Sequence, residues 1–165
     1  MENQRQILIL YYTRTGRTQK LAEAICKGAS SVTGVTCIIK TPEQVTDDDF
    51  INSDAIIAGS PVYFGTMAAE LKLVIDKLHR IRRKMEDKIG AAFATSQHHT
   101  GGKETTIMSI IQAFLICGMI IVGDPLETGG HYGIACDKDY TDRTESDGFK
   151  FGARVASLAK QMNVF

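Results

Sequence analysis

Residues 7–31 read ILILYYTRTGRTQKLAEAICKGASS, which is an apolar run, a short polar loop and a stretch with helical spacing of its apolar residues. The apolar run, residues 7–12, does not alternate with polar residues, as expected of a parallel strand that helices cover on both faces. The spacing in residues 19–31 predicts a helix that follows the strand after this short loop. A strand, a loop and a helix in this order form the first half of a β-α-β unit.

The same alternation continues along the chain. Further strands are expected at residues 37–40, 54–60, 89–95 and 119–123, and further helices at 67–80, 104–117 and 147–162. This pattern predicts one α/β domain over residues 1–165, with a five-stranded parallel sheet between two helix layers. Five strands favour the doubly wound order 2-1-3-4-5. Residues 41–53 have room for at most a short helix, and residues 124–146 are expected to form a long irregular loop of a kind that is often functional.

The bulk composition excludes several classes of protein. Hydrophobic residues make up 44% and charged residues 23% of the 165-residue chain, which is ordinary for a globular protein. The 19 basic and 19 acidic side chains leave no net charge that would attract nucleic acid or an anionic membrane. The longest apolar stretch, residues 113–122, is too short to insert across a bilayer. The N-terminal sequence does not resemble a secretory signal, so a cytoplasmic location is expected.

The four cysteines, Cys26, Cys37, Cys117 and Cys136, form no CxxC pair. Three of them lie in apolar runs, where a free thiol behaves as a small hydrophobic group. Free buried thiols are therefore favoured over disulfides or a metal site.

A ligand is expected where the first, third and fourth strands end, because open parallel sheets bind ligands beyond the carboxyl ends of their strands. The loop after the first strand consists of Thr13, Arg14, Thr15, Gly16, Arg17 and Thr18. Backbone amides at the start of the next helix, the helix dipole and the threonine hydroxyls would all favour a phosphate there. The loop fits neither GxxxxGK[ST] nor GxGxxG, which disfavours nucleoside triphosphates and ordinary dinucleotide binding. The alternative is a threonine-rich helix start with no ligand.

These loops resemble those of known flavin proteins. The Thr-x-Thr-Gly-x-Thr pattern at 13–18 resembles the FMN phosphate loop of flavodoxins. The segment SPVYFGTM at 60–67 is similar to the Thr-Pro-x-x-Phe-Gly-x-Met segment of the WrbA-type NAD(P)H:quinone oxidoreductases, and the loop at 95–102 resembles the Ser/Thr/Gly-rich loop of the same family. The resemblance covers nearly the whole chain, but the insertion that this family carries after the second strand is missing. The chain is therefore identified as a short form of the family.

The resemblance implies a flavodoxin-like three-layer sandwich that binds FMN non-covalently, with NAD(P)H as co-substrate and a small-molecule quinone as acceptor. It assigns the FMN phosphate to the first loop and places the flavin ring between the second and third loops. The ring contacts implied are Pro61, Val62, Tyr63, Phe64 and Gly65 from the second loop, Ser96, Gln97, His98, His99 and Gly101 from the third, and Tyr132 from the late loop. No side chain is assigned as a catalytic residue, because the flavin carries the chemistry.

Several of these residues have a second interpretation. Tyr63 stands where the family often has arginine, and Cys117 stands in place of a histidine near the flavin. Tyr63 and Phe64 could instead pack against the following helix. His131 and Tyr132 could belong to an inert loop, and the two loop arginines could simply be solvated. His98 and His99 invite a metal site, but adjacent residues rarely face one ion, so no metal is expected.

Three functions remain open on these residues. The favoured one is a two-electron reductase in which NAD(P)H reduces the flavin and a quinone then reoxidises it. A one-electron carrier is disfavoured because carriers are typically very acidic, and because the chain has no Trp to stack on the ring. A flavin-binding scaffold without turnover is the third. A homodimer or homotetramer is expected from the resemblance.

Overall fold

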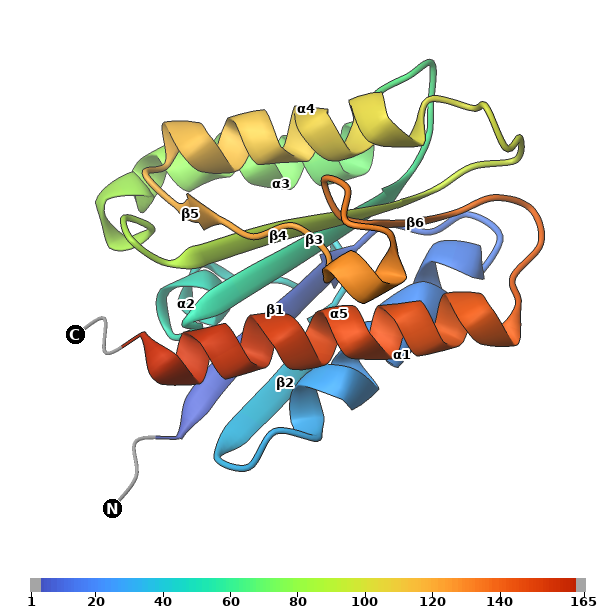
Figure 1. Ribbon diagram of the computed structural model, residues 1–165. Coiled ribbons are helices and arrows are strands. Elements are labelled where there is room, and N and C mark those ends of the chain that lie inside the picture. Colours follow the sequence, from blue (N-terminus) through green and yellow to red (C-terminus); the bar gives the residue numbers. More distant parts are fainter. Residues whose placement is uncertain (1–3, 163–165) are drawn as a thin grey trace.

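The computed structural model describes residues 4–162 and shows a parallel sheet with helices packed on both faces (Figure 1). The strands are β1 (Arg5–Tyr11), β2 (Val35–Lys40), β3 (Ala55–Pro61), β4 (Ile89–Thr95), β5 (Ile120–Ile121) and β6 (Ile134–Cys136). Their order is β2-β1-β3-β4-β5, and β6 also pairs with β4. All pairs are parallel. The predicted strand order is confirmed.

The helices fall into two layers. They are α1 (Arg17–Ser30), α2 (Asp47–Ile51), α3 (Ala69–Lys77), α4 (Lys103–Ile116) and α5 (Asp142–Gln161), with 3₁₀ turns η1 (Leu78–Arg80), η2 (Arg82–Lys84) and η3 (Leu126–Thr128). Helices α1 and α5 cover one face of the sheet, and α3 and α4 cover the other (Figure 1). Within residues 4–162, no helix is long and apolar enough to cross a membrane.

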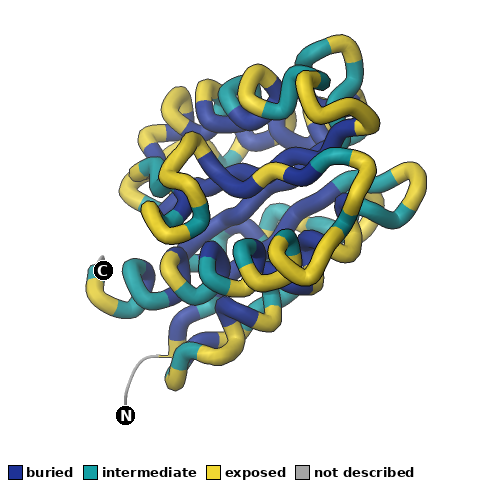
Figure 2. The backbone as a smooth tube through the Cα atoms, turned by 45° about the vertical axis from the view of Figure 1, so that its right-hand side comes forward, coloured by how far each residue is buried: buried dark blue, intermediate teal, exposed yellow. Residues whose placement is uncertain are grey.

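Burial on both faces of the sheet explains why apolar and polar residues do not alternate along the strands. Ile7 and Ile9 of β1 belong to the hydrophobic cluster under α1 and α5, whereas Leu8 and Leu10 belong to the cluster under α3 and α4. All four are completely buried. Figure 2 accordingly shows the central strands as the most deeply buried part of the chain, with exposure concentrated in loops and on outer helix surfaces.

Helices α1 and α5 pack unusually closely because glycines line their contact. A Cβ atom added to Gly152 of α5 would lie 1.9 Å from the carbonyl oxygen of Ile25 in α1. A Cβ added to Gly28 of α1 would lie 1.8 Å from the carbonyl oxygen of Phe149 in α5. The two backbones therefore meet directly at these points, with no room for any side chain.

A sixth strand was not expected, and it corrects the prediction for residues 124–146. Strand β5 pairs with Ile89 and Gly90 of β4, and β6 pairs with residues 93–95 of the same strand. Both short strands therefore lie along one edge of β4, and residues 122–133 interrupt that edge. Gly133 precedes β6 with φ 158°, and a Cβ there would lie 2.0 Å from the carbonyl oxygen of Ala92. Only glycine permits this approach of the chain to β4.

The interrupting segment is held by Asp124, which is only 7% exposed. Its carboxylate accepts hydrogen bonds from the backbone amides of Gly130 and His131, at 3.0 and 2.6 Å, and from the Thr128 hydroxyl at 2.9 Å.

Helix α5 also begins five residues earlier than predicted, at Asp142 rather than Asp147. A capping box between Thr141 and Thr144 satisfies its first amides. Residues 124–146 are thus more ordered than an irregular loop.

Candidate functional site

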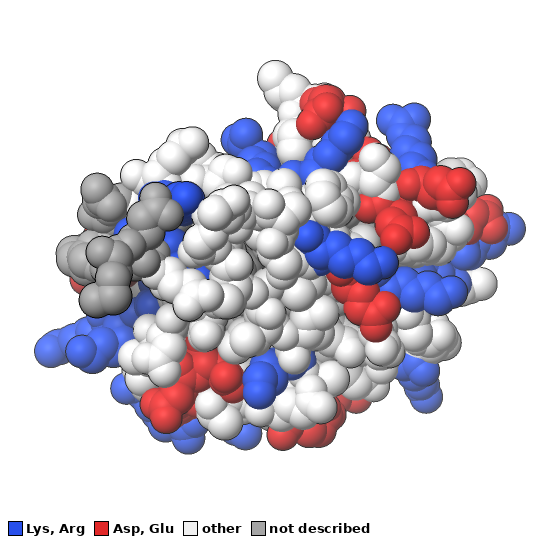
Figure 3. All heavy atoms as spheres, turned by 90° about the horizontal axis from the view of Figure 1, so that it is seen from below, with Lys and Arg blue, Asp and Glu red and all other residues white. Residues whose placement is uncertain are grey.

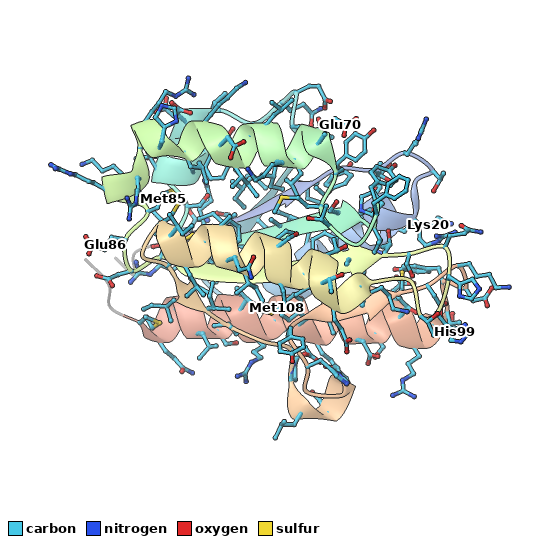
Figure 4. The ribbon with its side chains drawn as sticks, turned by 90° about the horizontal axis from the view of Figure 1, so that it is seen from above. Lys20, Glu70, Met85, Glu86, His99 and Met108 are labelled. Carbon is cyan, nitrogen blue, oxygen red and sulfur yellow. The ribbon has the colours of Figure 1, made fainter. Side chains whose placement is uncertain are left out.

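The three predicted loops meet at the carboxyl edge of the sheet. The backbone amide of Val62 in the second loop donates to the carbonyl of Thr95 at 2.8 Å. The guanidinium of Arg17 in the first loop donates to the carbonyl of Ser96 in the third at 3.0 Å. A Cβ on Gly102 would lie 3.3 Å from the Cα of Gly65, so the second and third loops also touch. Figure 4 shows this end of the molecule on the side of Lys20, Glu70 and His99, opposite Met85 and Glu86.

The start of α1 has the features of an anion site. Gly16 precedes the helix with φ 89°, no side chain caps the helix, and its first turn contains no acidic residue. The amide of Gly16 bonds to the Thr13 hydroxyl at 3.0 Å, which closes the turn. By contrast, α2 and α5 both carry complete capping boxes. The first amides of α1 therefore remain available for a bound anion.

The threonines of the first loop do not act alike. Thr15 is exposed, whereas the Thr18 hydroxyl is buried and lies 2.8 Å from the Thr95 hydroxyl at the end of β4. Thr18 was predicted to bind the phosphate, but its hydroxyl is hydrogen-bonded to the Thr95 hydroxyl. Only the backbone amide of Thr18 therefore remains to bind a ligand. Thr95 itself was not among the predicted site residues, although its place at the end of a central strand was a signal for it.

Replacing Thr18 by valine is expected to lower the free energy of unfolding by about 1–2 kcal/mol, because the buried Thr95 hydroxyl loses its partner. Urea unfolding measures the change, with Thr15→Val as the exposed control. The double variant Thr18→Val/Thr95→Val should recover part of the loss, since no unpaired hydroxyl remains. Equal stabilities of the Thr18 and Thr15 variants would contradict this account.

The second loop forms a tight turn with an exposed aromatic residue at its tip. The backbones of Tyr63 and Thr66 bond to each other in both directions, at 3.1 and 3.2 Å. Phe64 and Gly65 between them have φ values of 50° and 79°. A left-handed non-glycine residue costs roughly 1–2 kcal/mol, and such residues concentrate at functional sites. The Phe64 side chain is fully exposed, so the alternative in which it packs against the following helix is wrong.

The base of the second loop is fixed by its own hydrogen bonds. The Ser60 hydroxyl accepts from the amide of Ala68 at 2.8 Å and donates to the carbonyl of Pro61 at 2.7 Å. The ring of Tyr63 packs edge-on against that of Tyr12, with centroids 6.4 Å apart. Interaction of its hydroxyl with the Glu70 carboxylate raises the pKa of Tyr12 above its usual value. The Tyr63 ring thus packs against the end of the first strand and lines a cavity together with Glu70 at the start of α3.

The third loop is compact and is held by two cations. The amide of Gly101 donates to the carbonyl of His98 at 3.0 Å. The Lys103 ammonium donates to the carbonyl of His99 at 2.8 Å, and Arg17 also reaches the Gln97 side-chain oxygen at 3.4 Å. The His98 and His99 rings stack on each other with centroids 5.1 Å apart. Among residues 4–162, no group of three or more His, Cys, Asp or Glu side chains could hold a metal ion.

Two cavities open beside the loops. One of about 780 Å³ is lined by residues of the first two loops, including Arg14 and Tyr63, together with Tyr12 and Glu70. The other, of about 820 Å³, runs along β6 and is lined by His99 as well as by Tyr132 and its neighbours. Tyr132 is 51% exposed and shares this second cavity with the third loop.

Cys117 does not lie where the sequence suggested. It follows the last residue of α4, whereas the third loop precedes the first residue of the same 14-residue helix. Since α-helices rise about 1.5 Å per residue, the length of α4 separates Cys117 from the loops. Its thiol is buried, and burial raises the pKa of Cys117. The expected place of Cys117 near a flavin is therefore wrong within this chain.

Comparison with known proteins places the chain in a family. Residues 33–130 match the family model described as NADPH-dependent FMN reductase. A relative from Archaeoglobus fulgidus named NAD(P)H dehydrogenase (quinone) is 29% identical over 95% of this chain and 98% of its own length. One of the same name from Sinorhizobium fredii is 31% identical over 78% of this chain and 75% of its own length.

Solved structures show the same fold. A WrbA-like flavodoxin from Agrobacterium tumefaciens has a TM-score of 0.81 and 23% identity, and the match covers 95% of this chain and 98% of that one. A flavodoxin from the domain Archaea has a TM-score of 0.79 and 22% identity, and the match covers 94% of this chain and 99% of that one. The predicted flavodoxin-like fold is thus confirmed. With more than half of its length matched by the family model, the chain belongs to the NADPH-dependent FMN reductase family.

Proposed function

We propose that the chain is an FMN-dependent NAD(P)H:quinone oxidoreductase that works by two-electron transfer. The observation that carries the proposal is the meeting of an uncapped helix start with two turn-forming loops at one edge of the sheet. The relatives named NAD(P)H dehydrogenase (quinone) support the choice of nicotinamide and quinone as the two substrates.

The first loop fits a flavin phosphate. The uncapped amides at the start of α1 supply hydrogen-bond donors, and Gly16 provides the left-handed turn that gathers them. No carboxylate in the first turn opposes an anion. In this proposal the residues that hold the phosphate are Thr13, Arg14, Thr15, Gly16, Arg17 and Thr18, with Thr18 acting through its backbone amide.

The second and third loops fit the flavin ring. Pro61, Val62, Tyr63, Phe64 and Gly65 are proposed to border it on one side, and Ser96, Gln97, His98, His99 and Gly101 on the other. Bound FMN would supply the two-electron chemistry, and the chain binds, orients and tunes it. Arg17 and Lys103 both donate to carbonyls of the third loop, so this loop carries positive charge close to the proposed site. Such charge favours a cofactor that becomes more negative on reduction.

The proposed substrates would reach the site through the cavities beside the loops. The cavity along β6 offers Tyr132, His99 and His131 as polar and aromatic contacts. We propose that NAD(P)H and the quinone occupy the open side of the site one after the other. Tyr132 would then contact the bound ring or the substrate above it.

One experiment tests this function. FMN-loaded protein is mixed with NADPH or NADH without oxygen, and the flavin absorbance near 450 nm is followed before and after benzoquinone is added. A reductase loses this absorbance on mixing and regains it with quinone. A protein that ignores both nicotinamides but yields a stable one-electron reduced flavin with dithionite is a carrier, and an unresponsive flavin indicates a scaffold. Either outcome would reject the proposal.

We further propose a homo-oligomer, dimer or tetramer, in the cytoplasm. Leu73 of α3 and Leu115 and Ile116 of α4 are 62%, 55% and 65% exposed, which gives the face of these two helices apolar surface for a second copy. On the face seen in Figure 3, basic and acidic side chains are interspersed, which supports the expectation that nucleic acid is not a partner. The four unpaired cysteines support a reducing location.

A further inference from the structure

The two cavities beside the loops differ in charge. The cavity along β6 is lined by more acidic than basic side chains: Glu104, Asp124, Asp137, Asp139 and Asp147 against Lys103 and Arg143. Both of these cations already have partners, since Lys103 donates to a carbonyl of the third loop at 2.8 Å and Arg143 pairs with Asp147 at 3.6 Å. This cavity therefore disfavours a ligand with several negative charges and suits an uncharged one better.

The cavity between the first two loops has the opposite balance. Its cations are Arg14 and Lys72, and Glu70 in the first turn of α3 is the single acidic side chain among the described residues that line it. Arg14 is exposed and makes no hydrogen bond or ion pair within residues 4–162. Lys72 is 51% exposed and pairs at 2.6 Å with Asp76, which is one turn further along the helix and does not line the cavity. Two cations from different elements thus border one cavity.

Aromatic rings line the same cavity. Tyr12 follows the last residue of β1, and Tyr63 belongs to the second loop. Their rings meet edge to face, at 70° to each other, and both side chains are only partly buried. Purine bases stack well on exposed aromatic rings. The volume of about 780 Å³ lies within the range of roughly 300–1,000 Å³ that is usual for small-molecule sites.

We propose that this cavity binds the adenosine diphosphate half of the nicotinamide dinucleotide. The adenine lies against Tyr12 and Tyr63, the phosphates lie between Arg14 and Lys72, and the Glu70 carboxylate accepts hydrogen bonds from ribose hydroxyls. The nicotinamide half then reaches past the second loop to the ring site. The assignment rests on the proposed function, because it takes NAD(P)H to be a substrate.

Binding of ADP alone tests this site, because ADP has no nicotinamide and cannot reduce the flavin. FMN-loaded protein, in which the first loop already holds its phosphate, is titrated with ADP in a calorimeter. Lys72→Glu should weaken ADP binding about tenfold, because an anion replaces a cation beside the phosphates. Lys77→Glu makes the same change of charge at the last residue of α3, outside the cavity, and should leave the affinity unchanged.

The aromatic contact has its own pair of variants. Tyr12→Leu should weaken ADP binding about tenfold, because the base loses a ring to stack on. Tyr12→Phe keeps the ring and should keep most of the affinity. Added salt should reduce the effect of Lys72→Glu, which is electrostatic, but not that of Tyr12→Leu. Thermal melting and flavin absorbance show that each variant is folded and still holds FMN.

Several results would overturn the site. They are no binding of millimolar ADP to the FMN-loaded protein, binding only when FMN is absent, equal losses in Lys72→Glu and Lys77→Glu, and wild-type affinity in Tyr12→Leu.

The site and the proposed function can fail separately. A protein that binds ADP in the expected pattern but whose flavin ignores NAD(P)H keeps the nucleotide site and is not a reductase. A flavin that NAD(P)H reduces with the same concentration dependence in the wild type and in Lys72→Glu keeps the reductase and rejects the site.

Discussion

Replacing Gly152 by alanine is expected to lower the free energy of unfolding by about 3 kcal/mol. The new methyl group would lie 1.9 Å from a backbone oxygen of α1, so the two helices must move apart. Overpacking of this kind costs about 1–3 kcal/mol, and a clash with backbone, which cannot rotate away, falls at the upper end. Urea unfolding followed by circular dichroism measures the difference, and Gly28→Ala should behave similarly from the other side of the contact.

The control for this change is Ser146→Ala on the exposed face of the same helix. It adds the same alanine to α5 without a clash, and the helix propensity of alanine should leave stability equal or slightly higher. If Gly152→Ala were as stable as Ser146→Ala, the direct contact of the α1 and α5 backbones would be wrong.

Replacing Thr15 by aspartate is expected to weaken FMN binding about 100-fold, or by ~3 kcal/mol. The carboxylate would stand in the loop at the uncapped start of α1, where it repels a phosphate and competes for the same amides. Thr15 is exposed, so the fold should tolerate the change. Titration of the apoprotein with FMN, followed by quenching of flavin fluorescence, gives the dissociation constant.

Two comparisons separate a lost phosphate contact from a damaged site. Thr15→Asn has the same shape without the charge and should keep most of the affinity. Riboflavin, which lacks the phosphate, should bind the wild type and Thr15→Asp equally. A parallel fall in riboflavin affinity, or an unchanged FMN affinity, would mean that the phosphate does not lie at this loop.

The strands were predictable because a strand that is buried on both faces appears in the sequence as a continuous apolar run. Their order followed from the alternation of strands and helices. The fourth strand, Ile89–Thr95, begins and ends where its apolar run does. Strand β6 was not predictable in this way, because it has only three residues and is paired by its position beside β4. The first turn of α5 was missed because its residues are polar, and only the capping box of Thr141 marks its start.

The meeting of the three loops was predictable, but the hydrogen bonds between their side chains were not. Topology alone brings the ends of β1, β3 and β4 together, so the three loops had to meet. Nothing in a Thr-rich loop indicates which hydroxyl turns inward. The hydrogen bond between Thr18 and Thr95 depends on how the loop packs and could not be predicted from the sequence. Cys117 is a different case, because the predicted helix at 104–117 already placed it at the end opposite the third loop, and only the resemblance put it near a flavin.

The split edge of the sheet has a consequence for how this protein can diversify. Strands β5 and β6 pair with different residues of β4. The chain therefore leaves the sheet after β5 and returns to it at β6, and each of the two pairings fixes its own end of the segment between them. Residues between them can lengthen, shorten or change in character without shifting the register of any central strand. Because Tyr132 and His131 lie in that stretch and line a cavity, the lining of this cavity can change while the start of α1 stays as it is.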